Sequence, residues 1–178
     1  MNKNTEVSKE TILKAIQDNP KQYPMFLAKD LGVSEWEVIK ELGEESFTEI
    51  PIECFDTIMH EVSNWGMVTF IVSNDTVISE TKGELPNGSY AHGYYNFENS
   101  TIGIGGHINK DSLNGIGFVS RPFMGLESLS IQFFDKTGKA MFKIYLGRDD
   151  KKQIIHTQKE KFLKLKENLS NFKSLKKA

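Results

Sequence analysis

Cysteine is nearly absent from this sequence, because Cys54 is the only one among 178 residues and an internal disulfide therefore cannot form. Long apolar runs are also missing, and no stretch approaches the ~20 consecutive apolar residues of a membrane-spanning helix. A chain of this length buries roughly 70% of the surface that its unfolded form exposes, which is enough to fold without a disulfide or a metal ion. We therefore expect a single domain over residues 1–178 and no transmembrane segment.

A targeting segment is not recognisable either. The first ten residues, MNKNTEVSKE, are polar and lack the apolar region of a secretory signal peptide. The expected compartment is the cytoplasm.

Positive charge is scarce outside one end of the chain. Residues 151–178 contain nine lysines and two glutamates, whereas residues 1–150 contain 13 basic and 22 acidic residues, a net charge of −9. Proteins gain their non-specific affinity for nucleic acids by neutralising phosphates, so an acidic body attracts DNA or RNA weakly. A nucleic-acid partner is not expected, unless the basic C-terminal segment alone contacts it.

Residues 8–45 predict a group of short helices. Their apolar residues recur near the 3.6-residue helical period, and Pro20 and Pro24 separate two of the helices. Ser34 with Glu37 three residues later is typical of a capping box at the start of a third helix. Helix, glycine turn and helix also outline a DNA-binding helix-turn-helix. The segment that would read DNA, SEWEVIKELGEE, contains five glutamates and one lysine, so a structural helical cap is favoured over a DNA-binding regulator.

Residues 66–148 predict an antiparallel sheet. After an amphipathic helix predicted near residues 55–65, short runs rich in Val, Ile, Phe and Tyr follow one another with no helix between them. Neighbouring strands should then pair antiparallel. The predicted strands are 68–73, 77–82, 90–97, 102–109, 113–120, 129–135 and 140–146.

Residues 152–175 predict one long helix whose apolar stripe packs on the sheet, with lysines around that stripe. A membrane surface or an acidic partner is the alternative explanation for the lysines. The predicted fold class is therefore α+β: a large antiparallel sheet with an N-terminal helical cap and a long C-terminal helix packed on it.

Several catalytic motifs are absent. His60-Glu61 lacks the second histidine of a zinc-protease helix. The sequence contains no C-x-x-C, no G-x-S-x-G and no phosphate-binding G-x-x-x-x-G-K-[ST] motif. These absences leave the glycine-rich segment around His107 as the main candidate for chemistry.

In IGIGGHIN, the two-residue period of a strand places Gly103, Gly105 and His107 on one face. Glycine weakens a strand, so several glycines together need a reason. One explanation is a β-bulge or another backbone passing close. The other is a flat bay beside His107, in which a planar ligand lies while the imidazole reaches its centre; haem is the planar ligand whose iron takes imidazole.

Two further segments contain candidate ligand contacts. His92 lies among tyrosines in SYAHGYYNF, where aromatic packing is the alternative to contacts with a haem edge. Arg121, Phe123 and Met124 share the RPFMG loop. An arginine beside apolar side chains suits a ligand with an apolar plane and a carboxylate rim, and a plain surface turn with a buried Phe123 is equally compatible.

The order of these segments resembles the bacterial haem-utilisation carriers of the HutX/HuvX/ChuX type. The matching segments are WGMVTFIV (65–72), GELPNGSYAHGYYNF (83–97), GIGGHI (103–108), RPFMGLESLSIQFF (121–134) and GKAMFKIYLGRD (138–149). The resemblance implies a cytoplasmic homodimer that binds haem as cargo and carries imported haem to a degrading or storing partner. The chain is also similar to one half of larger tandem-repeat haem-handling proteins, so a haem-degrading enzyme that uses an external reductant is the alternative.

The resemblance also implies haem-binding residues. His107 falls on the histidine of the family's GGHI motif and is the implied iron ligand, and His92 falls on the histidine of its HGYF motif. Arg121, Phe123 and Met124 fall on its R-x-F-M-G loop, where Arg121 would meet a haem propionate.

Gly103 and Gly105 would give room for the haem ring. Ser73 departs from the family, because relatives have a histidine in a V-H-T motif there. Serine is a poor ligand for haem iron, so ligation by two histidines from these positions is not implied. Three alternatives follow: His107 ligates the iron with water or a tyrosine opposite it, His92 replaces the missing ligand, or haem binds weakly.

Overall fold

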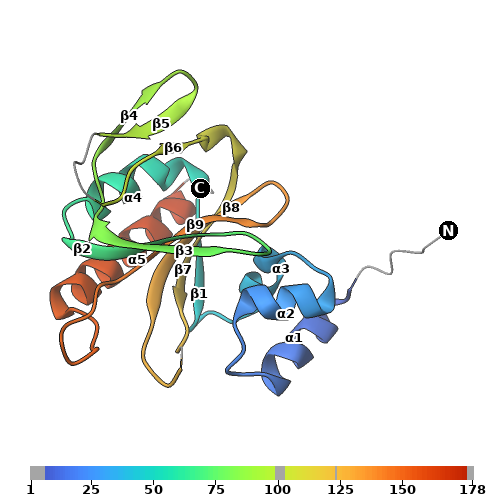
Figure 1. Ribbon diagram of the computed structural model, residues 1–178. Coiled ribbons are helices and arrows are strands. Elements are labelled where there is room, and N and C mark those ends of the chain that lie inside the picture. Colours follow the sequence, from blue (N-terminus) through green and yellow to red (C-terminus); the bar gives the residue numbers. More distant parts are fainter. Residues whose placement is uncertain (1–6, 99–102, 123, 176–178) are drawn as a thin grey trace.

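The computed structural model describes residues 7–98, 103–122 and 124–175, and its fold is α+β, as predicted (Figure 1). The helices are α1 (Lys9–Asp18), α2 (Pro24–Leu31), α3 (Glu35–Lys40), α4 (Phe55–Val62) and α5 (His156–Leu175), with 3₁₀ turns η1 (Ile52–Cys54) and η2 (Lys110–Ser112). The strands are β1 (Phe47–Ile50), β2 (Met67–Ser73), β3 (Ile78–Glu84), β4 (Gly88–Ala91), β5 (Tyr94–Phe97), β6 (His107–Ile108), β7 (Leu113–Ser120), β8 (Leu129–Asp135) and β9 (Ala140–Tyr145).

The strands form two antiparallel sheets. The large sheet has six strands in the order β1-β7-β8-β9-β2-β3, and the small sheet has three in the order β4-β5-β6. The predicted strands 113–120 and 129–135 coincide with β7 and β8. Strand β1 was not predicted, because its four residues FTEI form one short edge strand beside β7.

The prediction of one strand over residues 90–97 is wrong, because this segment is the β4–β5 hairpin. The two residues of its turn, His92 and Gly93, have φ angles of 52° and 81°. Positive φ at both central residues is what a type I′ turn requires, and such a turn reverses the chain within two residues.

The prediction of a strand over residues 102–109 is also wrong for most of those residues. Strand β6 contains only His107 and Ile108, and position 102 lies outside the described residues. Gly103 and Gly106 have φ angles of 110° and 128°, which L-residues other than glycine rarely adopt. The expected alternation of faces therefore does not hold from Gly103 to Gly106.

One face of the large sheet carries the main core, under α4, α5 and the small sheet (Figure 1). Phe133 stacks on Phe142 from the next strand, with ring centroids 4.2 Å apart. The predicted apolar stripe of the C-terminal helix is confirmed by its buried members, which are Phe162, Leu165 and Leu169. No helix within the described part of the chain has both the length and the apolarity to cross a membrane.

Helix α5 begins at His156 and not at residue 152 as predicted. Lys152 has a φ of 62°, and Arg148 pairs with Ile154 in an isolated antiparallel bridge. The chain therefore turns back on itself before the helix begins.

The opposite face of the large sheet holds the helical cap, α1–α3. Trp36 of α3 packs between Phe47 and Phe134, with ring centroids 5.6 and 4.8 Å away. The predicted capping box is present, since Ser34 and Glu37 exchange hydrogen bonds. Trp36 therefore joins the cap to the sheet by direct packing.

Candidate functional site

The small sheet presents one buried and one exposed face. Side chains alternate along a strand, and Tyr95, Phe97 and Ile108 are buried toward the large sheet. We call the other side the outward face; its residues are Ser89, Ala91, Tyr94, Asn96 and His107. The outward face is thus flat and built from mostly small or polar side chains around one imidazole.

His107 is exposed and is held by its neighbour on the central strand. Its Nδ1 lies 2.6 Å from Oδ1 of Asn96, the residue directly opposite it in the ladder. The ring of Tyr94 stands edge-on to the imidazole, with centroids 6.3 Å apart. An exposed imidazole with a tyrosine beside it can coordinate a metal centre that approaches from solvent.

The glycines before His107 leave open space. A Cβ atom added to Gly105 or Gly106 would meet no atom within 4 Å, and one added to Gly103 would lie 3.9 Å from the Cα of Gly83. The positive φ angles of Gly103 and Gly106 explain why glycine occupies these two positions, but Gly105 does not have a positive φ. The space beside Gly105 is therefore compatible with a bay, and no close backbone accounts for this glycine.

His92 lies at the exposed tip of the β4–β5 hairpin. It follows the last paired residues of that hairpin, Ala91 and Tyr94, whereas His107 pairs with Asn96 farther down the ladder. The two histidines therefore share one sheet, with His92 in the turn of the hairpin and His107 on the edge strand β6, opposite Asn96.

Arg121 is not brought to His107 within one chain. It follows the last residue of β7, whereas His107 precedes the first, and eight strand residues span roughly 23 Å. Burial lowers the pKa of the Arg121 guanidinium. The guanidinium donates to three carbonyls of the loop between α1 and α2, those of Asn19, Pro20 and Gln22, at 3.5, 3.1 and 3.2 Å.

The remaining predicted positions also lie away from the outward face. Met124 is 84% exposed on the loop after β7, and Phe123 lies outside the described residues. Ser73 pairs with Ile78 at the far end of β2 and lines a cavity of about 140 Å³ beside α2. Within one chain, serine at position 73 therefore removes nothing from the surroundings of His107.

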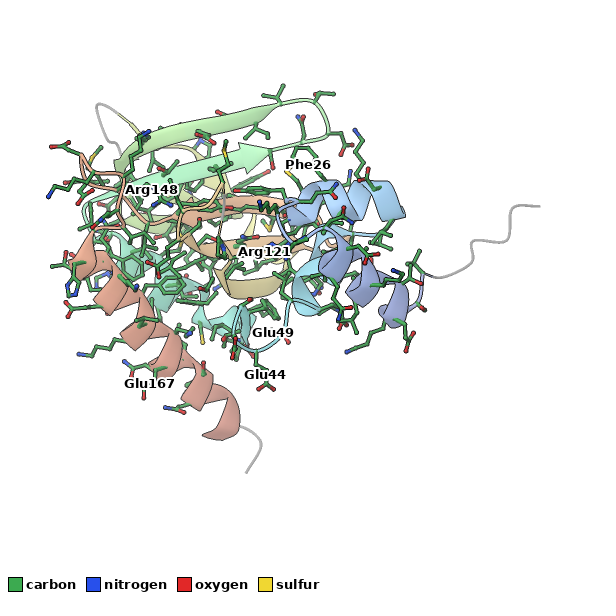
Figure 2. All side chains as sticks on the ribbon, turned by 90° about the horizontal axis from the view of Figure 1, so that it is seen from below. Phe26, Glu44, Glu49, Arg121, Arg148 and Glu167 are labelled. Atoms are coloured by element: carbon green, nitrogen blue, oxygen red, sulfur yellow. The ribbon has the colours of Figure 1, made fainter. Side chains whose placement is uncertain are left out.

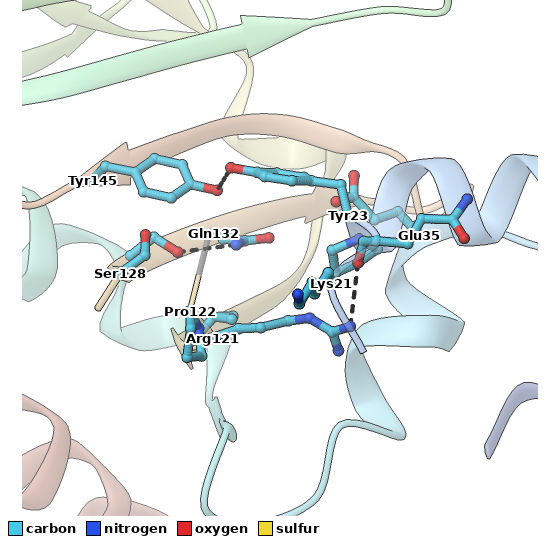
Figure 3. A pocket seen from close by; sticks show the side chains of 12 residues that line it. Lys21, Tyr23, Glu35, Arg121, Pro122, Ser128, Gln132 and Tyr145 are labelled. Atoms are coloured by element: carbon cyan, nitrogen blue, oxygen red, sulfur yellow. Dashed lines mark hydrogen bonds between the residues drawn. The ribbon is translucent and has the colours of Figure 1, made fainter. Parts of the chain in front are cut away.

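Several cavities lie on the cap side of the large sheet, where α2 or the loop before it lines them. Arg121, labelled in Figure 2 between Arg148 and Phe26, lines one of these cavities. Another cavity, of about 480 Å³, lies beside Gly103 and is also lined by Met67, Leu85 and Asn87. One cavity of about 410 Å³ is lined by Tyr23, Tyr145 and strands β2 and β3. A smaller one of about 20 Å³, shown in Figure 3, has room for one water.

Polar side chains line this smaller cavity. The hydroxyls of Tyr23 and Tyr145 lie 2.9 Å apart, and burial raises the pKa of both. Gln132 donates to Ser130 at 2.9 Å, while its buried Oε1 has no hydrogen-bond partner among the described residues. The Tyr23–Tyr145 hydrogen bond joins the cap to β9, whereas the Gln132–Ser130 bond lies within β8.

Sequence reasoning missed two polar arrangements, one on the small sheet and one between that sheet, α4 and η2. Asn96 is one, and its contact with His107 arises only from strand pairing. The other is the cluster of Asp56, Tyr90 and Lys110: the Tyr90 hydroxyl and the Lys110 ammonium donate to the two Asp56 carboxylate oxygens at 2.5 and 2.9 Å. Burial and the bond to Asp56 raise the pKa of Tyr90. No spacing in the sequence signals either arrangement.

A three-ligand metal site is not found in the part of the chain that the structure describes, since no three His, Cys, Asp or Glu side chains gather there. The outward face therefore offers a single imidazole, which suits a metal that brings its other ligands with it, as haem iron does.

Comparison with known proteins gives consistent results. Residues 48–165 match the family described as haem utilisation ChuX/HutX. A protein of Vibrio cholerae named "Intracellular heme transport protein HutX" is 33% identical over 162 residues, which cover 91% of this chain and 84% of the relative. The solved structure of "the Heme Binding Protein ChuX" is 36% identical, with a TM-score of 0.80 over 89% of this chain and 98% of that one. A crystal structure from Erwinia carotovora is 34% identical, with a TM-score of 0.85 and coverage of 89% and 98%.

Proposed function

Because the chain belongs to the haem utilisation ChuX/HutX family, we propose that it binds haem and carries it inside the cell to a degrading or storing partner. HutX is named a heme transport protein and ChuX a heme-binding protein, and both align with about nine-tenths of this chain. The observation that carries the proposal is the exposed imidazole of His107, held on the flat outward face of the small sheet.

His107 is the proposed iron ligand. Haem supplies four ring nitrogens to its iron, so one imidazole from the protein completes a stable five-coordinate site. Gly105 leaves room for the ring beside this imidazole, and Gly103 continues the same segment. The ring of Tyr94, whose centroid lies 6.3 Å from that of His107, is a further contact for the haem. A single protein ligand on an open face is appropriate for a carrier, since the cargo must leave again.

A homodimer is the second part of the proposal. One flat face contacts one side of haem and leaves the other exposed. Arg121 and Met124 are not brought to His107 within one chain, and we assign the RPFMG loop, with Arg121, Phe123 and Met124, to haem held by a second copy. The 84% exposure of the apolar Met124 side chain supports a partner surface there. Sedimentation velocity with and without haem tests this part, and a monomer under both conditions contradicts it.

His92 is proposed as an alternative ligand from the hairpin tip. The cytoplasm is the proposed compartment, supported by the word intracellular in the name of the Vibrio cholerae relative. A haem-degrading or haem-storing acceptor is the proposed downstream partner.

A haem titration followed by absorbance tests the iron ligand. We expect saturable binding at one haem per chain, with the Soret shift lost in His107→Ala and retained in His92→Ala. His60→Ala is the matched control, because His60 is an exposed histidine on α4. Loss only in His92→Ala would assign the ligand to the hairpin tip. Unsaturable adsorption by the unmodified protein would overturn the carrier proposal.

A further inference from the structure

The side-chain amide of Asn96 has a defined orientation. One of its terminal atoms lies 3.3 Å from the carbonyl oxygen of Ser89, 3.0 Å from that of Ala91 and 2.8 Å from that of Tyr94. Carbonyl oxygens only accept hydrogen bonds, so the atom among them is the amide nitrogen. The other terminal atom, which faces His107, is then the amide oxygen.

This orientation selects one tautomer of His107. The amide oxygen of Asn96 can only accept, and it lies 2.6 Å from Nδ1 of the imidazole. Nδ1 must therefore carry the proton and donate it. A neutral imidazole has one N–H, so the lone pair lies on Nε2. The exposed nitrogen of His107 is thereby the one that can coordinate a metal.

The backbone fixes Asn96 in place. It lies on β5, the central strand of the small sheet, and pairs with Ser89 on one side and His107 on the other. Its amide is held on the β4 side by carbonyl groups and on the β6 side by the imidazole. Rotation of the imidazole would cost the hydrogen bond between them.

We propose that Asn96 is a positioning residue, which holds His107 with Nδ1 protonated and the Nε2 lone pair ready for haem iron. The proposal rests on the proposed function for the identity of the metal centre, whereas the tautomer is a property of the protein without haem. The choice of a neutral amide also matters. A carboxylate at this position would draw the Nδ1 proton more strongly and make the imidazole a stronger ligand. An amide orients the ring with less increase in basicity, which favours release.

The experiment has a readout that needs no haem. Long-range ¹⁵N–¹H correlation spectra of protein labelled with ¹⁵N-histidine report which ring nitrogen carries the proton, at alkaline pH where imidazoles are neutral. We expect the Nδ1–H pattern for His107, a loss of that preference in Asn96→Ala, and its retention in Asn96→Asp. The other three histidines, His60, His92 and His156, are internal controls that should not change.

Haem titration of the same variants gives the functional readout. Loss of a hydrogen-bond partner of a metal ligand costs 10–100-fold in affinity, so we expect Asn96→Ala to bind haem at least about tenfold more weakly. Asn96→Asp loses the N–H donors that face the carbonyl oxygens of Ser89, Ala91 and Tyr94 but keeps an acceptor for His107, and its haem affinity should not fall. If both variants weaken binding equally, Asn96 braces the hairpin and does not position the imidazole.

The two proposals fail separately. An Nε2–H pattern for His107 in the unmodified protein overturns the role of Asn96, whatever the haem affinity. Unchanged haem binding by His107→Ala overturns the proposed iron ligand, even where the spectra show the Nδ1–H tautomer.

Discussion

The ion pair between Glu35 and Lys143 joins the helical cap to the large sheet, and its removal should lower the stability of the protein. Lys143 Nζ lies 2.5 Å from Glu35 Oε1, and the two side chains are 4% and 9% exposed. Removal of one partner from such a pair leaves an uncompensated buried charge, which typically costs 3–5 kcal/mol. We therefore expect Lys143→Met or Glu35→Gln to lower the free energy of unfolding by about 3 kcal/mol or more.

Equilibrium unfolding in urea measures this loss. A protein of this size loses roughly 2–3 kcal/mol of stability per molar urea, so the midpoint should fall by roughly 1–2 M. The double variant Glu35→Leu/Lys143→Met removes both charges, and we expect it to be more stable than either single variant. Trp36 fluorescence follows the cap and Trp65 fluorescence follows the main core.

An exposed ion pair supplies the control. Lys139 and Asp75 lie 3.5 Å apart with side chains 69% and 83% exposed, and Lys139→Met should change stability by less than about 1 kcal/mol. Equal midpoints for Lys139→Met and Lys143→Met would refute the reasoning. Deletion of residues 1–45 extends the test, because it leaves Lys143 without its partner. A truncated protein that melts at an unchanged temperature would show the cap to be a separate module and contradict the expected single domain.

Four further predictions concern packing, haem binding, acid unfolding and haem degradation. Gly115→Ala should lower the free energy of unfolding by about 1–3 kcal/mol in a thermal melt, because the added Cβ would lie 2.8 Å from the packed ring of Trp36. Gly105→Val should leave stability nearly unchanged but weaken haem binding, because its side chain would fill the space beside His107. An unchanged haem affinity would contradict the proposal that haem lies in this space. Hydrogen bonds from Ser34 lower the pKa of Glu37. The contribution of the Glu37 carboxylate to stability is therefore complete above the unfolded pKa of 4.5 and disappears as the pH falls through the lowered value. In Glu37→Gln, the free energy of unfolding should depend less on pH over this acidic range. Haem-loaded protein mixed with reductant and air should keep its Soret band in the presence of catalase, and steady loss of the band with product formation would favour the degrading enzyme instead.

The sequence was most informative where local pattern and tertiary structure agree. Strands β7 and β8 were predicted over their full lengths, since apolar β-formers run between clear turn residues at both ends. The cap was predicted from helical periodicity, and Ser34 marked the start of α3. In these segments each residue prefers locally what the fold requires.

The site was less predictable for two physical reasons. His92 at positive φ gives a type I′ turn without the usual Asn-Gly or Asp-Gly signal, so the sequence predicts one strand where the structure has a hairpin. Glycine permits both extended and left-handed backbone, and the sequence alone does not show which one Gly103 adopts. Asn96 has no local signal, because its contact with His107 depends on which strands pair.

The exposure of the outward face determines how haem would be transferred from the carrier to an acceptor protein. Where the Arg121 loop of a second copy contacts only the rim of the haem, a ligand from an acceptor protein can approach the iron on the side opposite His107 before the first bond breaks. Exchange by this route is associative, so its rate rises with the concentration of acceptor, whereas spontaneous loss does not depend on it. Haem held on such a face would stay bound while the carrier diffuses alone and would leave quickly when an acceptor docks.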